Sequence, residues 1–248
     1  MIHIIKNVVK KIIGKNNKKW VDLGLTQKEY DLISRIHLKK LTYLSEIRLT
    51  SIVKTCNSLE RDDIQGVFIE AGCALGGSAI LIASCKQKPR PLFIYDVFGM
   101  IPPPTKDDTS DVHERYKIIL EGKSKGINGD NYYGYETDLY NVVRSNFKDF
   151  GITCEEQSVN LIKGLVQDTM KINQSVAFAH IDVDWYEPVL TCLKQIFPNL
   201  AIGGSIILDD YHDWGGCRKA TDEYLLEVSG QFMLDDSAGS LKITRVKI

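Results

Sequence analysis

The chain has 248 residues, of which 44% are hydrophobic and 25% charged, and its formal net charge is −1. A chain of this length can form one large α/β domain, and this composition excludes a disordered or collagen-like protein. Because the near-zero net charge creates no global attraction for phosphates, we expect a small-molecule ligand and no nucleic acid partner.

The cysteine pattern and the apolar runs indicate the cellular compartment of the protein. No CxxC pair or zinc-like spacing is present, so we interpret the six cysteines as reduced core residues: Cys56, Cys73, Cys85, Cys154, Cys192 and Cys217. Reduced cysteines fit a cytoplasmic protein. There is no run of 18 apolar residues, so no helix is expected to span a membrane.

Residues 1–60 predict a helical appendage. The first 20 residues contain six lysines and no acid, with apolar residues at helical spacing. We predict that this helix packs on the domain or on a second subunit of a homo-oligomer; a basic helix lying on an anionic membrane is the alternative. Residues 26–58 predict two helices, which open with Thr26 and Glu29 in capping-box spacing.

Short apolar runs and helices alternate from Gly66 onward. The predicted strands are GVFIEAG, LFIYD, VNLIK, VAFAHID, SIILDD, QFMLDD and LKITRVKI, and the predicted helices are GGSAILIASCK, TCLKQIFPNL and CRKATDEYLLEV. This βαβ rhythm is typical of a parallel sheet covered on both faces, and the last two strands predict a hairpin. Residues 61–248 therefore predict an α/β domain with a Rossmann-like, doubly wound, mostly parallel seven-stranded sheet that ends in an antiparallel hairpin.

Residues 99–146 interrupt the alternation. This stretch contains three prolines at 102–104 and the Gly/Asn/Tyr-rich run GINGDNYYGY. A long insertion on a compact domain is often a lid or a binding loop, and we predict that role here, with a solvated decoration as the alternative. Its tyrosines could line a ligand pocket or fix the loop to the core: Tyr132, Tyr133, Tyr135 and Tyr140.

The ends of the first two predicted strands indicate a cofactor site. Glu70 closes the first strand, and the glycines that follow it let a ligand approach the backbone at the start of a helix. Asp96 ends the second strand about 20 residues after this turn, where a carboxylate can accept hydrogen bonds from a ribose diol. Together they predict an adenosine-containing cofactor, although either acid could instead cap a helix.

The densest group of acids follows two later strands. Asp182 and Asp184 share a face if the chain is extended, and Asp209 and Asp210 end the next strand. Carboxylates this close repel one another unless a cation neutralises them, and Mg²⁺ matches oxygen ligands; helix capping is the alternative. We interpret His180 as a core residue, and His212 as a candidate base or a group behind the metal ligands.

At these residues the sequence resembles the macrocin O-methyltransferase (TylF-like) family, whose members methylate sugar hydroxyls on antibiotics. The matching stretches are ISR at 33–35, EAGCALGGS at 70–78, YDVFGMIPPP at 95–104, HIDVDWYEPVLTCL at 180–193 and PNLAIGGSIILDDYHDWGGCRKATDEY at 198–224. The chain departs from the family at VFGM, where relatives carry SF-acid-G, and in the tyrosine-rich stretch around residue 130.

The resemblance implies a role for each matched position. S-adenosylmethionine (SAM) would contact Glu70, Ala71, Gly72, Gly76, Ser78, Asp96, Phe98 and Asp182. Mg²⁺ would be held by Asp182, Asp209 and Asp210. Asp184 would be the general base, with His212 as the second candidate. Residues 61–248 would then be the methyltransferase domain, with the acceptor-binding lid at 99–146.

We therefore predict a SAM-dependent, Mg²⁺-assisted O-methyltransferase that acts on a hydroxyl of a small sugar-containing or other natural-product acceptor. Three alternatives remain open at this point. A catechol-type O-methyltransferase would use the same cofactor and metal. A nicotinamide-dependent oxidoreductase is weakened by the missing GxGxxG motif. A non-catalytic nucleotide-binding module would leave the clustered acids unexplained.

Overall fold

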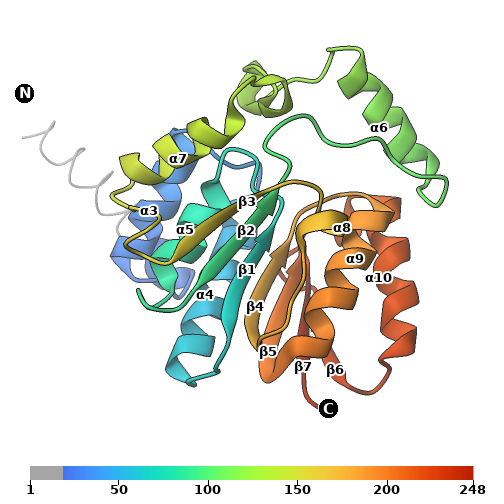
Figure 1. Ribbon diagram of the computed structural model, residues 1–248. Coiled ribbons are helices and arrows are strands. Elements are labelled where there is room, and N and C mark those ends of the chain that lie inside the picture. The colour runs from blue at the N-terminus through green and yellow to red at the C-terminus, as the bar shows by residue number, and fades with distance from the viewer. Residues whose placement is uncertain (1–18, 248) are drawn as a thin grey trace, which may run out of the picture.

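The computed structural model of the protein describes residues 19–247 (Figure 1). The predicted basic helix near the N-terminus lies almost wholly outside this range, so its position stays a prediction. Within the described range, none of the helices combines the length and the apolar character that crossing a membrane requires.

Within residues 19–247, seven strands form one mostly parallel sheet, as predicted, and their order is β3-β2-β1-β4-β5-β7-β6. In chain order they are β1 (Val67–Ala71), β2 (Leu92–Asp96), β3 (Val159–Lys163), β4 (Val176–Ile181), β5 (Leu200–Leu208), β6 (Phe232–Asp235) and β7 (Leu241–Arg245). The first five are parallel to one another, whereas β7 is antiparallel to both β5 and β6. The C-terminal hairpin therefore inserts its second strand beside β5.

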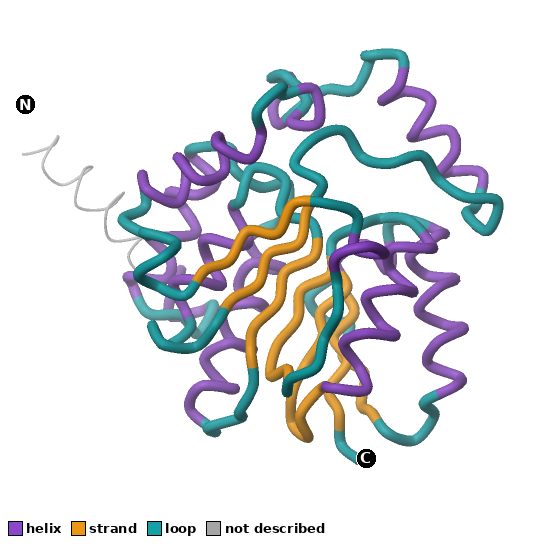
Figure 2. Tube along the Cα trace, viewed as in Figure 1, coloured by secondary structure: helices purple, strands orange, loops and turns teal. Residues whose placement is uncertain are grey.

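Helices cover both faces of this sheet (Figures 1 and 2). One face is covered by α3 (Gln27–Leu38), α4 (Glu46–Arg61), α5 (Gly77–Cys85) and α7 (Leu139–Asp149), and the other by α8 (Val166–Thr169), α9 (Tyr186–Ile196) and α10 (Gly215–Glu227). The short α2 (Lys19–Asp22) precedes α3, and α6 (Ser110–Leu120) lies in the insertion. Because both faces are covered, every residue of the central strands β1 and β4 is buried.

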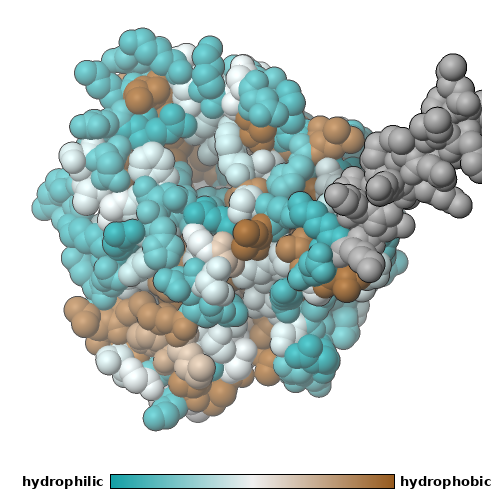
Figure 3. Space-filling model, turned by 180° about the vertical axis from the view of Figure 1, so that it is seen from behind, coloured by the Kyte–Doolittle hydropathy of each residue, from teal (hydrophilic) through white to brown (hydrophobic). Residues whose placement is uncertain are grey.

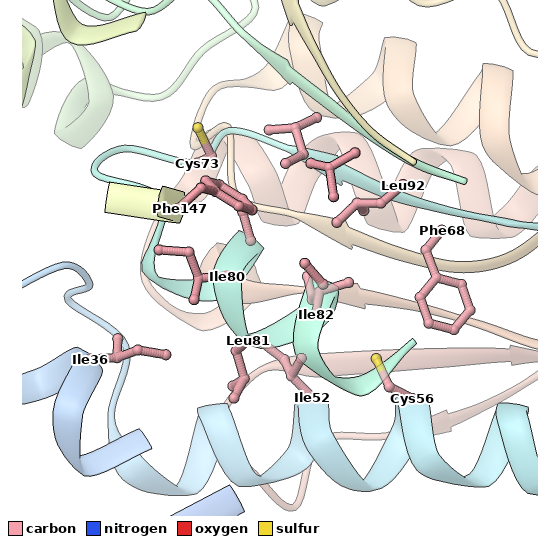
Figure 4. Close-up of a cluster of buried hydrophobic side chains, with 14 of the residues drawn as sticks. Ile36, Ile52, Cys56, Phe68, Cys73, Ile80, Leu81, Ile82, Leu92 and Phe147 are labelled. Carbon is pink, nitrogen blue, oxygen red and sulfur yellow. The ribbon is translucent and has the colours of Figure 1, made fainter. Parts of the chain in front are cut away.

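The described part of the predicted N-terminal appendage, from residue 19 onward, contributes to the core of the domain. Figure 4 shows Ile52 and Cys56 of α4 packed with Ile80, Leu81 and Ile82 of α5, and all five are fully buried. Helix α5 lies between the sheet and α4, which explains why its sequence is apolar all round. The predicted boundary at residue 60 falls inside α4.

Some predicted element boundaries are wrong. The helix expected over 191–200 runs from Tyr186 to Ile196 and is followed by the 3-10 turn η3 (Phe197–Asn199), since Pro198 cannot continue an α-helix. Two strands end earlier than predicted: β4 ends at Ile181, one residue earlier, and β5 ends at Leu208, two residues earlier, before the 3-10 turn η4 (Asp209–His212). The acids therefore lie in the loops above the sheet.

The insertion is fixed to the ends of two helices. Asp108 accepts a hydrogen bond from the backbone N–H of Tyr186, the first residue of α9 (2.7 Å), and Asp111 accepts one from Gly215, the first residue of α10 (3.0 Å). The first N–H groups of a helix lack partners within the helix, so carboxylates from another segment can satisfy them. These two contacts hold α6 above the first turns of α9 and α10, on the side of the molecule to which the carboxyl ends of the strands point (Figure 1).

Seen from behind, the surface is mostly hydrophilic, with hydrophobic residues gathered on the side where β6 and the C-terminus lie (Figure 3). Strand β6 is the outer strand of the sheet, and its Met233 and Leu234 are 65% and 51% exposed. Exposed apolar residues on an edge strand are compatible with subunit contacts. The predicted homo-oligomer nevertheless stays a prediction.

Candidate active site

The loops that follow β1, β2 and β4 contain backbone conformations that side chains rarely adopt. Ala74, Phe98 and Asp184 have φ angles of 45°, 48° and 57°, in the left-handed region. Such conformations persist only where surrounding contacts hold them, and they concentrate at functional sites. All three lie at the carboxyl edge of the sheet, where open α/β sheets bind their ligands.

A cavity opens at this edge, with walls from the loops after β1, β2, β3 and β4. Its lining includes Gly72, Asp96, Leu165, Asp182 and Trp185. Gly72 has a φ of 79°, and a Cβ at this position would overlap the carbonyl oxygen of Asp182. Only glycine lets the two loops approach this closely. The mixed apolar and polar lining of the cavity suits a nucleoside cofactor.

Asp96 is held in place by two backbone donors. Its carboxylate oxygens accept hydrogen bonds from the N–H of Cys73 (2.7 Å) and the N–H of Phe98 (2.6 Å). Burial raises the pKa of Asp96, while these hydrogen bonds oppose the rise. A carboxylate oxygen can accept more than one hydrogen bond, so Asp96 keeps acceptor capacity for a ribose diol.

Glu70 and His180 form a buried pair beneath the glycine turn. Both side chains are fully buried; Glu70 accepts a hydrogen bond from the Ser78 hydroxyl and lies 3.3 Å from Nδ1 of His180. Burial opposes a charge on His180, but the Glu70 carboxylate, together with the charges of Asp182 and Asp209, outweighs it and raises the pKa of His180 to about 9. His180 is thus the core histidine that we predicted, and Glu70 supports the start of α5 from below.

The predicted cofactor contacts divide into two groups. Gly72, Asp96 and Asp182 line the first cavity, and Ser78 lines the adjoining one. The others line neither cavity and lie beneath or beside the loops: Glu70, Ala71, Gly76 and Phe98. Phe98 contributes its backbone N–H to Asp96, and its ring packs edge-on against Tyr140.

Three carboxylates meet where β4 and β5 end. Oxygen atoms of Asp182, Asp184 and Asp210 all lie within 4.8 Å of one another, and Asp209, Asp210 and Asp213 form a second such group. Burial and the neighbouring acids raise the pKa of Asp182 and of Asp210 well above the ordinary value. Burial also raises the pKa of Asp184 to about 6. One buried oxygen of Asp210 has no hydrogen-bond partner among the described residues. Carboxylates this close repel one another unless a cation neutralises them.

Arg48 is a site residue that the sequence did not reveal. It extends from α4, and its guanidinium lies 2.9 Å from Asp209 and 2.8 Å from Asp213. It also donates a hydrogen bond to the carbonyl of Gly239 (2.7 Å). One oxygen of Asp209 therefore faces Arg48, while the other is buried without a partner among residues 19–247. No local motif marks Arg48, because its partners lie far away in the sequence.

His212 lies apart from the three carboxylates. Its side chain is exposed, and its Nε2 lies 3.7 Å from a carboxylate oxygen of Asp236. It lines neither cavity. Of the two predicted candidates for the base, only Asp184 lines both cavities.

A second cavity adjoins the first. The residues common to both are Gly72, Asp96, Tyr133, Asp182, Asp184 and Trp185. The second cavity adds side chains from the N-terminal helices and from the insertion, among them Tyr43, Arg48, Arg115 and Tyr132. Of the four tyrosines predicted to be candidates, Tyr132 and Tyr133 line the cavity. Tyr135 instead donates to the carbonyl of Ile119 (2.6 Å) and braces the insertion.

Known proteins share this sequence and this fold. Over 188 residues, the chain is 24% identical to demethyldecarbamoylnovobiocin O-methyltransferase from Streptomyces niveus; this match covers 71% of the chain and 64% of the relative, so less than two thirds of that protein's length is matched. A second relative is 8-demethyl-8-(2,3-dimethoxy-alpha-L-rhamnosyl)-tetracenomycin-C 4'-O-methyltransferase from Streptomyces olivaceus, which is 24% identical over 205 residues, covering 80% of the chain and 71% of the relative.

Solved structures agree on the architecture. The O-methyltransferase NovP superposes with a TM-score of 0.70 at 22% identity, covering 84% of the chain and 83% of NovP. The SAH-bound Podospora anserina methyltransferase PaMTH1 superposes with a TM-score of 0.54 at 15% identity, covering 90% of the chain and 89% of PaMTH1. These likenesses confirm the predicted Rossmann-like fold.

The comparison with families is the most specific of the three. Residues 37–229 match the family described as Macrocin-O-methyltransferase (TylF). The matched range includes Arg48, the glycine turn, Asp96, the insertion and all the clustered acids. The chain therefore belongs to the macrocin O-methyltransferase (TylF) family, as its motifs predicted.

Proposed function

We propose that this protein is a SAM-dependent, Mg²⁺-assisted O-methyltransferase that acts on a hydroxyl of a small, sugar-containing natural-product acceptor. The observation that carries the proposal is the wall that the two cavities share: Asp182 and Asp184 line it, and Asp210 of the second cavity has a carboxylate oxygen within 4.8 Å of theirs. One cavity can hold a cofactor and the other an acceptor, with the acids at the junction. Such an arrangement brings two reactants together at a group able to take a proton.

SAM fits the first cavity. Asp96 offers acceptor oxygens at the end of β2 for the ribose hydroxyls, and the turn at Gly72 lets the ligand reach the backbone. When bound, SAM supplies an electrophilic methyl group on its sulfonium. Family membership and the existence of an SAH-bound protein of similar fold support this cofactor.

A divalent cation fits the three carboxylates. Their oxygens lie within 4.8 Å of one another, and the unpartnered buried oxygen of Asp210 is an available ligand. Oxygen donors of this kind suit Mg²⁺. We propose Asp182 and Asp210 as ligands, with Asp209 contributing the oxygen that does not face Arg48. When bound, Mg²⁺ would lower the pKa of an acceptor hydroxyl and orient it.

Asp184 is the proposed general base. An alcohol is a weak nucleophile until it loses its proton, so a base must lie beside the acceptor oxygen. Asp184 lines both cavities, and burial raises its pKa to about 6, closer to neutrality than an ordinary carboxyl. A base whose pKa is near the working pH is both ionised and able to accept a proton. His212 lines neither cavity, which disfavours it.

The acceptor class rests on the relatives. Both bear names of O-methyltransferases of elaborate natural products, and one name specifies a rhamnosyl compound and a 4'-O position. We therefore favour a sugar hydroxyl over a catechol. Membership in a methyltransferase family leaves the nicotinamide oxidoreductase and the non-catalytic module without support.

Location and assembly are part of the proposal. All six cysteines are free, as expected in a reducing compartment, and we propose a cytoplasmic protein. We also propose that it forms a homo-oligomer, with the exposed outer strand β6 as the candidate contact.

The test is product detection by mass spectrometry. Purified protein is incubated with SAM, Mg²⁺ and a panel that contains glycosylated macrolides, glycosylated aromatic polyketides and simple catechols. The proposal expects a gain of one methylene unit on a glycosylated acceptor, formation of SAH, and loss of both when EDTA is added. Methylation of catechols alone would favour the catechol alternative, and full activity in EDTA would contradict the metal role.

A further inference from the structure

The second cavity contains two guanidinium groups whose surroundings differ. Arg48 contacts Asp209 and Asp213 directly, so its charge is neutralised within the protein. Arg115, on α6 of the insertion, has no carboxylate within 4.0 Å among residues 19–247. It is partly buried and lines the cavity. A partly desolvated cation without a counter-ion is costly for a protein unless a ligand neutralises it.

Neighbouring side chains hold Arg115 in position. Its Nη2 donates to the hydroxyl of Ser124 (2.8 Å), and its guanidinium lies 5.7 Å from the ring centroid of Tyr132. The backbone N–H of Ser124 in turn donates to the hydroxyl of Tyr135 (3.2 Å). Asp111, on the same helix, docks α6 onto α10. The guanidinium is therefore pre-organised toward the cavity, and a held fork binds anions better than a flexible one.

The location of Arg115 relates it to the proposed base. Arg115 and Asp184 both line the second cavity. Among the described residues, no ion pair joins the two side chains. A ligand between them would place one end at the carboxylates and the other at Arg115. Tyr43, Tyr132 and Tyr133 would flank it.

We propose that the acceptor carries an anionic group, a carboxylate or a phosphate, that pairs with Arg115 while the hydroxyl to be methylated lies at Asp184. The planar guanidinium fork matches both oxyanions and binds them through two parallel hydrogen bonds. The inference rests on the proposed function for the place of the hydroxyl, but the anion site itself depends only on Arg115 and the cavity. It narrows the proposed acceptor from sugars in general to an acidic or phosphorylated sugar.

The experiment measures binding, so it does not require turnover. D-glucuronate, D-glucose 6-phosphate and neutral D-glucose are titrated into the protein saturated with SAH and Mg²⁺, and binding is followed by saturation-transfer NMR. At least one anionic sugar should bind about tenfold more tightly than glucose or better, as expected for a charge-assisted hydrogen-bonded pair. The two anionic arms show whether a carboxylate or a phosphate is preferred.

Three variants decide the assignment. Arg115→Gln should abolish the preference for the anion while glucose binding and SAH affinity stay unchanged, and Arg115→Lys should retain part of it because the charge remains. Asp210→Asn is the control for an anion that binds to the metal. The proposal is overturned if the wild type shows no anion preference, if Arg115→Gln leaves the preference intact, or if only Asp210→Asn removes it.

Two further readouts keep the outcomes separate. If Arg115→Gln is poorly folded, the comparison between the wild type and Arg115→Lys, with the loss of anion preference at high salt, still tests the pairing. If SAH does not bind the wild type but the anion preference depends on Arg115, the methyltransferase proposal fails and the anion site stands.

Discussion

Two groups of buried or partly buried acids lie at the same edge of the sheet, and they differ in what neutralises them. Glu70 is paired with His180 and accepts a hydrogen bond from Ser78, so this group is satisfied within the protein. Asp182, Asp184 and Asp210 lie close to one another. None of the described basic side chains lies within ion-pair distance of these three carboxylates. A buried charge that is paired within the protein indicates a structural role, whereas a buried charge without such a partner indicates a ligand-binding site.

The largest expected effect comes from removing the cation or one of its proposed ligands. EDTA should abolish methyl transfer, and Asp210→Asn should reduce it strongly at low Mg²⁺ with partial recovery at high Mg²⁺, since the variant weakens the site without removing it. Activity measured against Mg²⁺ concentration tests this. The same variant should make the metal-free protein more stable, because one repelling charge is gone. If metal-free Asp210→Asn melted at a lower temperature than the metal-free wild type, the three acids would not be an uncompensated group.

Replacing the proposed base should separate chemistry from binding. Asp184→Asn should lower kcat by roughly 10²–10⁴-fold, the usual contribution of a general base. Calorimetry should show SAM binding unchanged and Mg²⁺ binding largely retained. His212→Asn is the matched control and should keep near-normal turnover, because His212 lines neither cavity. The reverse result, an inactive His212 variant beside an active Asp184 variant, would exchange the two assignments.

Breaking the satisfied pair should affect stability more than catalysis. Glu70→Gln leaves His180 buried without its counter-charge and should cost about 3–5 kcal/mol in the free energy of unfolding. Urea denaturation measures this cost. A double variant with leucine at both Glu70 and His180 should recover much of the loss, since an apolar pair needs no compensation. A single variant as stable as the wild type would show that the pair is not a structural contact.

The stability of the metal-free protein should depend on pH because of the uncompensated acids. In the metal-free protein the pKa of Asp184 is raised from 3.8 to about 6, so between these values the folded state binds more protons than the unfolded state. Stability should therefore fall as pH rises through this window. Saturating Mg²⁺ should remove the fall. Thermal melts between these pH values, with and without Mg²⁺, measure this fall in stability. A stability that rises with pH in EDTA would contradict the raised pKa of Asp184.

The smallest effect is expected at the contact that docks the insertion. Asp108→Ala removes the acceptor for the first N–H of α9 and should cost about 1 kcal/mol, the usual value of a helix cap. Hydrogen exchange should become faster in residues 99–120, and binding of SAH with an acceptor should restore part of the protection. Unchanged exchange would show that other contacts hold this segment.

Much of this architecture follows from local sequence patterns. The period of the apolar runs predicted all seven strands, and the acids after them predicted the carboxyl edge as the site, because parallel strands bring their ends to one edge. Thr26 and Glu29 predicted the start of α3, where the structure shows a capping box. Strand ends were less accurate, since Asp182, Asp209 and Asp210 lie in loops that no periodicity marks.

The sequence by itself determined the fold, the family motifs and the presence of clustered acids, because these depend on short-range periodicity and spacing. Only the tertiary structure decided which acids are compensated: Glu70 meets His180 across neighbouring strands, and Arg48 reaches Asp209 from a helix 161 residues away in the chain. It also placed Arg115 of the insertion in the second cavity, without a carboxylate partner among residues 19–247. Such pairings depend on the packing of distant segments, which local pattern cannot encode.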